Sequence, residues 1–373
     1  MEKRSTKYEL LKVVALCMII ISHSLPRYGS YQTPGWLDFT AANPWRQFPL
    51  LLVMQYFGQQ GNAIFVTVSA WFLVDSDTVR SKKIWRFVLD TVFFSLLFLA
   101  GYELSGLNLP PREIFRYAFP FLHMNNWFVA TYMIYYLIHP ALNWIIRRLN
   151  QRQHLGVLLI GGVFYSLIPT LISEHAYYSS NMTGFILIYF IVAYLKLYRP
   201  ELCADRRKNR AVLLASIAAL IAAIFALNAL GLRVAFLRRQ MMRFAMFQSP
   251  LMTLIALSAM NLLGSHAVPY TRWINTVSSL SLLLYIIHEN VLFALYGKPA
   301  FWTWIYESFG YRWIILWTLG FAAACFLGSL AIALLYRRVL GKATDRLIDA
   351  FDKAARRRFS SLLDRLTAKE RYL

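Results

Sequence analysis

Runs of about twenty apolar residues recur along the whole chain, and they constrain the fold more than any other feature. A helix of about 20 apolar residues crosses the roughly 30 Å hydrocarbon core of a membrane and satisfies its own backbone hydrogen bonds there. The chain is 58% hydrophobic and only 15% charged, whereas soluble domains average about 25% charged residues. We therefore predict an all-α integral membrane protein, a bundle of about ten transmembrane helices. The spans are expected at residues 10–28, 50–74, 84–105, 125–146, 155–172, 180–198, 211–231, 244–263, 273–296 and 313–336.

The positions of the basic residues predict how these spans are oriented. The chain carries 39 Lys and Arg against 18 Asp and Glu, a formal net charge of +21. If the N-terminus is cytoplasmic, most of these cations fall on the cytoplasmic side, and both termini lie there. The charge then indicates topology and contact with anionic membrane lipids, and no basic soluble domain suggests a nucleic-acid partner. The arginines of the 232–243 loop would lie outside, so either this loop forms a basic functional surface or one span is misplaced.

The end of the chain has a different pattern from the rest. Arg and Lys are frequent after residue 336, and apolar residues recur there near one helical face. Such a helix is typical of segments that lie on a membrane surface. We expect a transmembrane domain at 1–336 and a cytoplasmic basic amphipathic tail at 337–373. The apolar residues that share the face are Leu347, Phe351, Phe359, Leu362 and Leu366.

The first predicted span carries a polar stripe. Lys12 and His23 are eleven positions apart, so at about 100° per residue they point from one face, roughly 16 Å apart along the axis. Glu9 lies one turn before Lys12 on the same side. Ionisable groups inside a membrane are costly and usually face a cavity or a partner. On spacing alone, His23 is either a functional imidazole or a packing residue that is hydrogen-bonded to a neighbouring helix.

The spacing of Glu9, Lys12 and His23 resembles the first span of the bacterial acyltransferase-3 family of membrane O-acyltransferases. The family usually has Arg at the position of Lys12 and often Asp at that of Glu9, and lysine lacks the two-pronged guanidinium. Four later stretches resemble the family in the same order, and together the likeness covers about residues 5–336. They are GNAIFVTVSAWFLV from Gly61, RSKKIWRF from Arg80, NNWFVATYMIYYLIHPALN from Asn125 and SLSLLLYIIHENVLF from Ser279. Members that modify capsular polysaccharide or exopolysaccharide look most similar.

The resemblance implies a donor and an acceptor on opposite sides of the membrane. Such enzymes take an acetyl group from acetyl-CoA at the cytoplasmic face and pass it to a sugar hydroxyl at the outer face. Coenzyme A is anionic, so a basic surface should bind it. The residues expected there are Lys12, Arg80, Lys82, Lys83 and Arg86. The same cations could instead reflect only the positive-inside rule, and Asp90 is placed to pair with Arg86 one helical turn away.

The resemblance also implies roles for individual residues. His23 is expected as the general base on the acceptor hydroxyl, although an acetyl-histidine intermediate is an alternative. Glu9, Lys12 and His288 complete the expected catalytic set, with Glu289 as a possible partner of His288. Ser69, Trp127 and Tyr285 are expected to bind substrate, and Ser69, Trp127 and Lys12 could stabilise the oxyanion. No metal or permanently bound cofactor is expected, and acetyl-CoA would be the donor substrate.

The remaining expectations concern location, partners and rival functions. The resemblance implies a multi-pass protein of the bacterial inner membrane. Its expected partners are membrane lipids, acyl-CoA and a polysaccharide or lipid-linked sugar acceptor, with no nucleic acid. A transporter or flippase of lipid-linked saccharides would also fit ten spans, but no paired Gly/Pro-interrupted spans mark inverted repeats. A polysaccharide polymerase would need a longer outer loop rich in arginine than 232–243 provides.

Overall fold

The structure, a computed structural model, describes residues 5–27, 36–120, 127–172 and 180–370, with side chains up to residue 357. Every regular element among these residues is helical. The α-helices are α1 Thr6–His23, α2 Phe48–Leu73, α3 Ser81–Leu104, α4 Pro111–Ala118, α5 Trp127–Ile146, α6 Gln151–Gly162, α7 Ile168–Leu171, α8 Asn181–Tyr198, α9 Pro200–Ala204, α10 Arg206–Gly231, α11 Pro250–Gly264, α12 Arg272–Ser279, α13 Ser281–His288, α14 Lys298–Phe309, α15 Ile314–Val339 and α16 Gly341–Glu370. Three short helical turns complete the list: η1 Val163–Leu167, η2 Ala235–Leu237 and η3 Phe293–Gly297.

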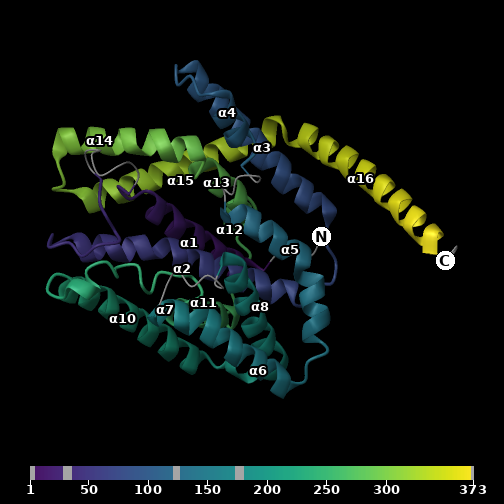
Figure 1. The fold of residues 1–373 in the computed structure, drawn as a ribbon, viewed down its shortest axis with the longest axis horizontal. Coiled ribbons are helices and arrows are strands. Elements are labelled where there is room, and N and C mark those ends of the chain that lie inside the picture. The colour runs from purple at the N-terminus through teal and green to yellow at the C-terminus, as the bar shows by residue number, and fades with distance from the viewer. Residues whose placement is uncertain (1–4, 28–35, 121–126, 173–179, 371–373) are drawn as a thin grey trace.

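Helices α1 and α2 pack closely against each other in the middle of the molecule. Figure 1 shows them between α14 and α15 on one side and α10 on the other, and α1 also contacts α11, α12 and α13. Two glycines of α2 permit the close approach. A Cβ atom at Gly58 would lie 2.6 Å from Ser22 Oγ, and one at Gly61 would lie 2.5 Å from the carbonyl oxygen of Ala15. Small residues at these positions therefore bring the face of α2 against the end of α1 that carries His23.

In the part of the chain that the structure describes, five helices are long and apolar enough to cross a membrane: Ser81–Leu104, Gln151–Leu171, Asn181–Tyr198, Arg206–Gly231 and Ile314–Val339. The first helix is also 18 residues long, but Lys7, Glu9 and Lys12 lie in its first half. Each predicted apolar run overlaps a helix, so the all-helical class is confirmed. The number of about ten membrane spans stays a prediction.

One predicted span is not the single continuous helix that the sequence predicted. Residues 273–296 form parts of α12, α13 and η3 rather than a single helix. Leu280 separates α12 from α13, and α13 ends at His288. The side chain of Asn290 then accepts a hydrogen bond at 3.0 Å from the backbone N–H of Leu292, as an asparagine does at a helix start. His288 and Glu289 consequently lie at a break between helices.

Helix α16 follows α15 and packs along the beginning of α3. Trp85 of α3 stacks on Phe351 of α16 with ring centroids 5.5 Å apart. Lys82 pairs with Asp349 at 2.6 Å, and Arg86 pairs with Asp345. Figure 1 shows α16 running from the helical bundle out to the C-terminus. Its predicted role as a membrane-surface helix stays a prediction, and Phe359, Leu362 and Leu366 lie outside the described side chains.

Candidate active site

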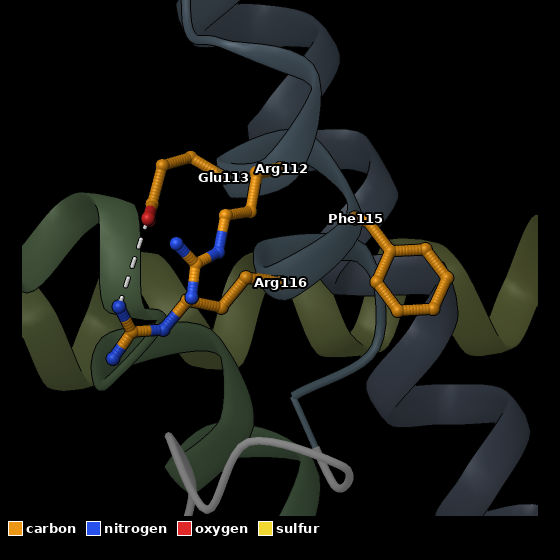
Figure 2. Close-up of a pocket in the computed structure, with 4 residues that line it drawn as sticks. All are labelled: Arg112, Glu113, Phe115 and Arg116. Carbon is orange, nitrogen blue, oxygen red and sulfur yellow. Dashed lines mark ion pairs between the residues drawn. The ribbon is translucent and has the colours of Figure 1, made fainter.

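Helix α4 lines a cavity of about 740 Å³ that contains little catalytic chemistry. Its lining residues are Arg112, Glu113, Phe115 and Arg116, and Figure 2 shows both guanidinium groups on one side of the helix. Arg116 pairs with Glu113 at 3.7 Å. Neither a histidine nor a hydroxyl side chain is among these residues, and the sequence predicted none of them as part of the site. The α4 cavity is therefore a weaker candidate for an active site than the surroundings of the predicted histidines.

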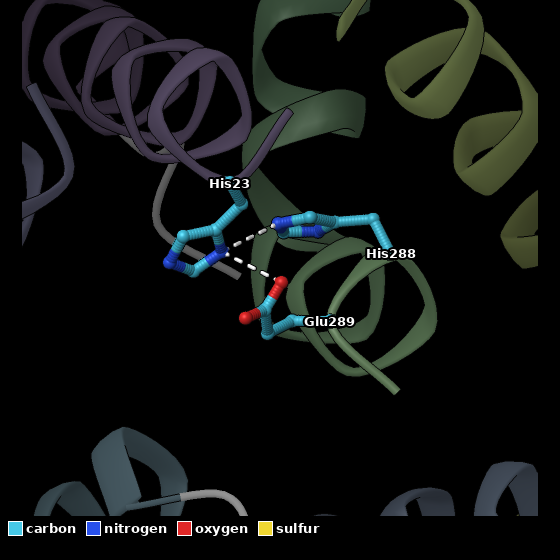
Figure 3. A group of neighbouring side chains, drawn as sticks. All are labelled: His23, His288 and Glu289. Carbon is cyan, nitrogen blue, oxygen red and sulfur yellow. Dashed lines mark hydrogen bonds and ion pairs between the residues drawn. The ribbon is translucent and has the colours of Figure 1, made fainter. Parts of the chain in front are cut away.

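A compact cluster forms where the ends of α1 and α13 meet. Figure 3 shows the rings of His23 and His288 next to each other, with the carboxylate of Glu289 beside His23. His23 Nδ1 lies 3.3 Å from His288 Nε2 and 3.0 Å from Glu289 Oε2. Trp302 of α14 donates from its indole nitrogen to the carbonyl oxygen of Ser24 at 3.1 Å, which fixes the end of α1. The cluster thus joins residues 265 positions apart in the sequence.

The hydrogen bonds around His288 determine which nitrogen of His23 carries a proton. His288 Nδ1 lies 2.7 Å from the carbonyl oxygen of Leu284, which can only accept, so this nitrogen is the donor. The Nε2 atom of a neutral His288 is then an acceptor, and both neighbours of His23 Nδ1 accept. His23 Nδ1 therefore bears the hydrogen, and His23 Nε2 has a free lone pair. Figure 3 shows this second nitrogen on the side of the ring away from both partners.

Two cations lie next to Glu289. Lys298 of α14 forms an ion pair with Glu289 Oε2, and Arg27 Nη2 lies 3.8 Å from Oε1. The Lys298 side chain is only 1% exposed, so its charge has been removed from solvent and needs this carboxylate. The π-helical turn η3 comes directly before Lys298 and directs it back toward the break after α13.

The spacing of the cluster would suit a metal ion, but the charges around it would not. Ligand atoms of His23, His288 and Glu289 lie within 4.8 Å of one another. A divalent cation would have to share Glu289 with Lys298 and Arg27, which already neutralise the carboxylate. The geometry and charges fit a histidine oriented by a carboxylate better than a metal centre.

His23 opens onto a cavity of about 120 Å³. That volume corresponds to about four liquid water molecules, enough for reacting groups though not for a whole coenzyme. Two residues predicted to bind substrate, Trp127 and Tyr285, line it together with His23. The Tyr285 ring lies 6.1 Å from the His23 ring and 5.6 Å from that of His288. The full lining is Ser22, His23, Arg27, Gln55, Gly58, Gln59, Asn62, Trp127, Tyr285 and Glu289.

The other predicted residues of the first span, Glu9 and Lys12, lie in a second cluster, the Lys12 cluster. Glu9 is buried and accepts hydrogen bonds from Lys12 Nζ, at 3.2 Å, and from Ser278 Oγ. Ser69 Oγ lies 3.3 Å from the hydroxyl of Tyr132, and Lys83 Nζ lies 5.5 Å from the centre of the Tyr132 ring. Ser69 is therefore next to a tyrosine and to a lysine of the RSKKIWRF stretch, the basic run that holds Arg80, Lys82, Lys83 and Arg86. It does not line the His23 cavity.

The basic run is divided among different partners. Lys83 lies over the Tyr136 ring at 4.1 Å and faces the inside of the bundle. Lys82 and Arg86 are paired with aspartates of α16, and Arg80 is exposed. The expected pair between Arg86 and Asp90 is replaced, because Asp90 accepts a hydrogen bond from the Tyr336 hydroxyl at 2.8 Å. A shared donor-binding role for these four cations stays a prediction.

Several residues of the site were not predicted. Lys298 and Arg27 were missed, although a lysine within the apolar stretch after Leu292 is an unusual feature. Gln55, Gln59 and Asn62 were missed as well, since amides within a long apolar helix also occur as packing residues. Glu289 was considered only as a partner of His288, whereas its carboxylate contacts His23.

The family model described as "Acyltransferase domain", that of the acyltransferase-3 family, matches residues 6–338 of the chain. The matched region contains the His23 cavity and the Lys12 cluster, and it ends just before α16. No curated protein and no solved structure matches the chain.

Proposed function

The chain belongs to the acyltransferase-3 family, and from this premise we propose that it is a membrane O-acyltransferase in which His23 is the general base. The donor would be an acyl-CoA, most simply acetyl-CoA, and the acceptor a hydroxyl of a cell-surface polysaccharide or lipid-linked sugar. Its proposed location is the bacterial inner membrane, with both termini in the cytoplasm.

One observation carries the proposal: His23 Nε2 has a free lone pair and its ring lines a cavity, while Glu289 is held against Nδ1. A general base needs an unprotonated nitrogen within reach of the hydroxyl that it activates. A carboxylate behind the imidazole fixes the tautomer and stabilises the cation that forms when the base takes a proton. His23 has both features, and His288 supports the same tautomer.

The reaction would proceed as a direct transfer. The acceptor hydroxyl gives its proton to His23 Nε2 as its oxygen forms a bond to the thioester carbonyl carbon. The carbon–sulfur bond then breaks, and the leaving sulfur takes the proton from Nε2. Tyr285 and Trp127, which line the cavity, each carry a donor, a hydroxyl and an indole N–H, that could serve the developing oxyanion. An acetyl-histidine intermediate would use the same nitrogen as a nucleophile.

The donor would approach from the Lys12 cluster. Lys12 is on the helix that carries His23, where it pairs with Glu9, and Lys83 lies over the ring of Tyr132, whose hydroxyl is 3.3 Å from Ser69 Oγ. Anionic phosphates of coenzyme A favour such cations. Lys82 and Arg86 already have carboxylate partners, so Lys83 is the strongest candidate of the run.

The test is loss of the acyl group from the surface polysaccharide. Cells that produce His23→Ala should export polymer of normal amount that lacks the acetyl mass increment, as measured by mass spectrometry of the isolated polysaccharide. His266→Ala is the matched control, because His266 is exposed and lies outside the site. Normal acetylation per repeat with reduced export would instead support a transporter or flippase.

A further inference from the structure

Helix α2 presents a row of three amide side chains to the His23 cavity. Gln55, Gln59 and Asn62 are four and three positions apart, which places them on one face of a helix. All three line the cavity with His23. The row extends over roughly 10 Å along the helix axis, the length of about two sugar rings or of one ring with its substituents. Gly58 lies in the same stretch and holds this part of α2 against α1.

The side-chain oxygens of two of the amides lack hydrogen-bond partners among the described residues. Gln55 is 8% exposed and Asn62 is 5% exposed. Gln55 Oε1 and Asn62 Oδ1 are buried without a partner. A buried polar atom without a hydrogen bond destabilises a protein, so such atoms usually have a purpose. Both amides would gain partners if hydroxyl groups entered the cavity, because a hydroxyl can donate to the amide oxygen and accept from the amide N–H.

The third amide connects the His23 cavity to a larger one. Gln59 also lines a cavity of about 450 Å³. The other residues around that cavity are neutral: Ser180, Asn181, Met242, Ala245, Met246, Phe247 and Gln248. Trp127 of the His23 cavity stacks on Phe247 of the larger cavity, with ring centroids 6.4 Å apart and planes at 20°. Amides, hydroxyls and flat aromatic rings are the groups that bind hydroxylated rings.

We propose that the α2 amide row, Gln55, Gln59 and Asn62, is the acceptor subsite and that it selects an uncharged, polyhydroxylated acceptor. The acceptor would enter through the larger cavity, pass Gln59 and the Trp127–Phe247 pair, and place one hydroxyl at His23 Nε2. This inference rests on the proposed acyl transfer and adds the class of acceptor.

The charges of the two sides support this assignment. Arg27 and Glu289 are the charged residues that line the His23 cavity, they lie 3.8 Å apart, and Lys298 pairs with the same carboxylate, so the neutral lining of the larger cavity carries the argument about charge. The larger cavity has no charged residue among those that line it in the described structure. Lys12 and Lys83 lie in the other cluster, where the anionic donor is proposed to bind. The acceptor side is therefore suited to neutral hydroxyl groups.

The experiment uses the full-length protein purified in detergent, with radiolabelled acetyl-CoA as donor. Methyl α-D-glucopyranoside is the neutral probe and D-glucuronate the anionic one, and transfer to each is compared with hydrolysis of the donor by water. Gln55→Leu and Asn62→Leu should each lower the ratio of glucoside transfer to hydrolysis about tenfold, the effect of one lost hydrogen bond of about 1.4 kcal/mol. The wild type should prefer the glucoside to glucuronate.

Gln60→Leu is the matched control, because Gln60 is a buried amide of the same helix whose Oε1 likewise has no partner among the described residues, but its amide donates to the carbonyl oxygen of Met252 at 3.2 Å and it does not line the cavity. It should leave the transfer ratio unchanged. The inference is overturned if the wild type transfers no more to the glucoside than to glucuronate, or if Gln55→Leu behaves like Gln60→Leu. Absence of any His23-dependent turnover, hydrolysis included, would instead refute the proposed acyl transfer itself.

Discussion

His23 Nδ1 lies 3.0 Å from Glu289 Oε2, so one nitrogen of the imidazole has a carboxylate partner and the other, Nε2, lies on the opposite side of the ring (Figure 3). The two residues come from α1 and from the break after α13, and Lys298 holds the carboxylate in place. The proposed general base requires such a contact, because a carboxylate stabilises the imidazolium that forms when the base takes up a proton.

The first prediction concerns the charge of Glu289. Glu289→Gln keeps the shape of the side chain but removes the negative charge that stabilises the His23 cation during transfer. We expect kcat to fall by roughly 10² to 10⁴ with little change in the KM for acyl-CoA. Steady-state kinetics of the purified protein would measure both constants. Glu307→Gln is the control, since Glu307 is exposed on α14, and a kcat for Glu289→Gln within twofold of the wild type would contradict the role.

The second prediction concerns the buried ion pair between Lys298 and Glu289. Glu289→Gln leaves the Lys298 ammonium buried without its carboxylate, so it should lower the free energy of unfolding by about 3 kcal/mol. Lys298→Met should lower it by less, because Arg27 still lies 3.8 Å from Glu289. The double variant should be more stable than the sum of the two losses implies, because no charge is then left alone. Thermal unfolding of the four proteins in detergent would test this. Strictly additive losses would mean that the pair is not coupled.

The third prediction concerns the contact of α1 with α2 at Gly58. A Cβ atom there would lie 2.6 Å from Ser22 Oγ, next to His23, so Gly58→Ala should separate the helices near the cavity. We expect a loss of stability of about 1–3 kcal/mol and a lower kcat. Gly101→Ala in α3 is the matched control, because a Cβ atom there has nothing within 4 Å. Equal behaviour of the two variants would show that the close approach at Gly58 is unimportant.

The fourth prediction separates the neighbouring lysines of the basic run. Lys83 lies over the rings of Tyr132 and Tyr136, whereas the Lys82 side chain is 59% exposed and pairs with Asp349. Lys83→Met should therefore raise the KM for acyl-CoA about tenfold, and Lys82→Met should change it less than twofold, since exposed pairs contribute little. The measurement is the KM at low ionic strength. A larger effect at Lys82 would place the donor on the surface beside α16.

Much of the fold could be predicted from the sequence, because a helix that must bury its backbone in an apolar environment needs a long apolar run. The runs gave the positions of α2, α3, α8 and α15 within a few residues. They failed at 273–296, where the Asn290 side chain bonds to the backbone N–H of Leu292 and starts a new helix. The hydrophobicity of a segment does not show where a side chain takes a backbone N–H as its partner and so interrupts the helix.

The candidate site could be predicted in part. The polar stripe of α1 indicated His23, and the resemblance to the family indicated His288. The contact of Glu289 with His23 depends on the helix break, and the position of Lys298 depends on the turn η3. Gln55 and Asn62 become informative only when their partners are known, because the sequence does not show which buried amides are satisfied.

The position of His23 between the proposed acceptor and donor sites has a consequence for bioenergetics. On its Nδ1 side the described contacts lead through His288 to the carbonyl oxygen of Leu284, and to the carboxylate of Glu289, which also contacts Lys298 and Arg27. In the proposed reaction the proton that the acceptor hydroxyl gives to Nε2 leaves with the thiol product. With the acceptor on the outer side and the thioester on the cytoplasmic side, each transfer would carry one proton inward. We therefore expect turnover in sealed proteoliposomes to be faster when a proton gradient is directed from the acceptor side to the donor side than when it is reversed.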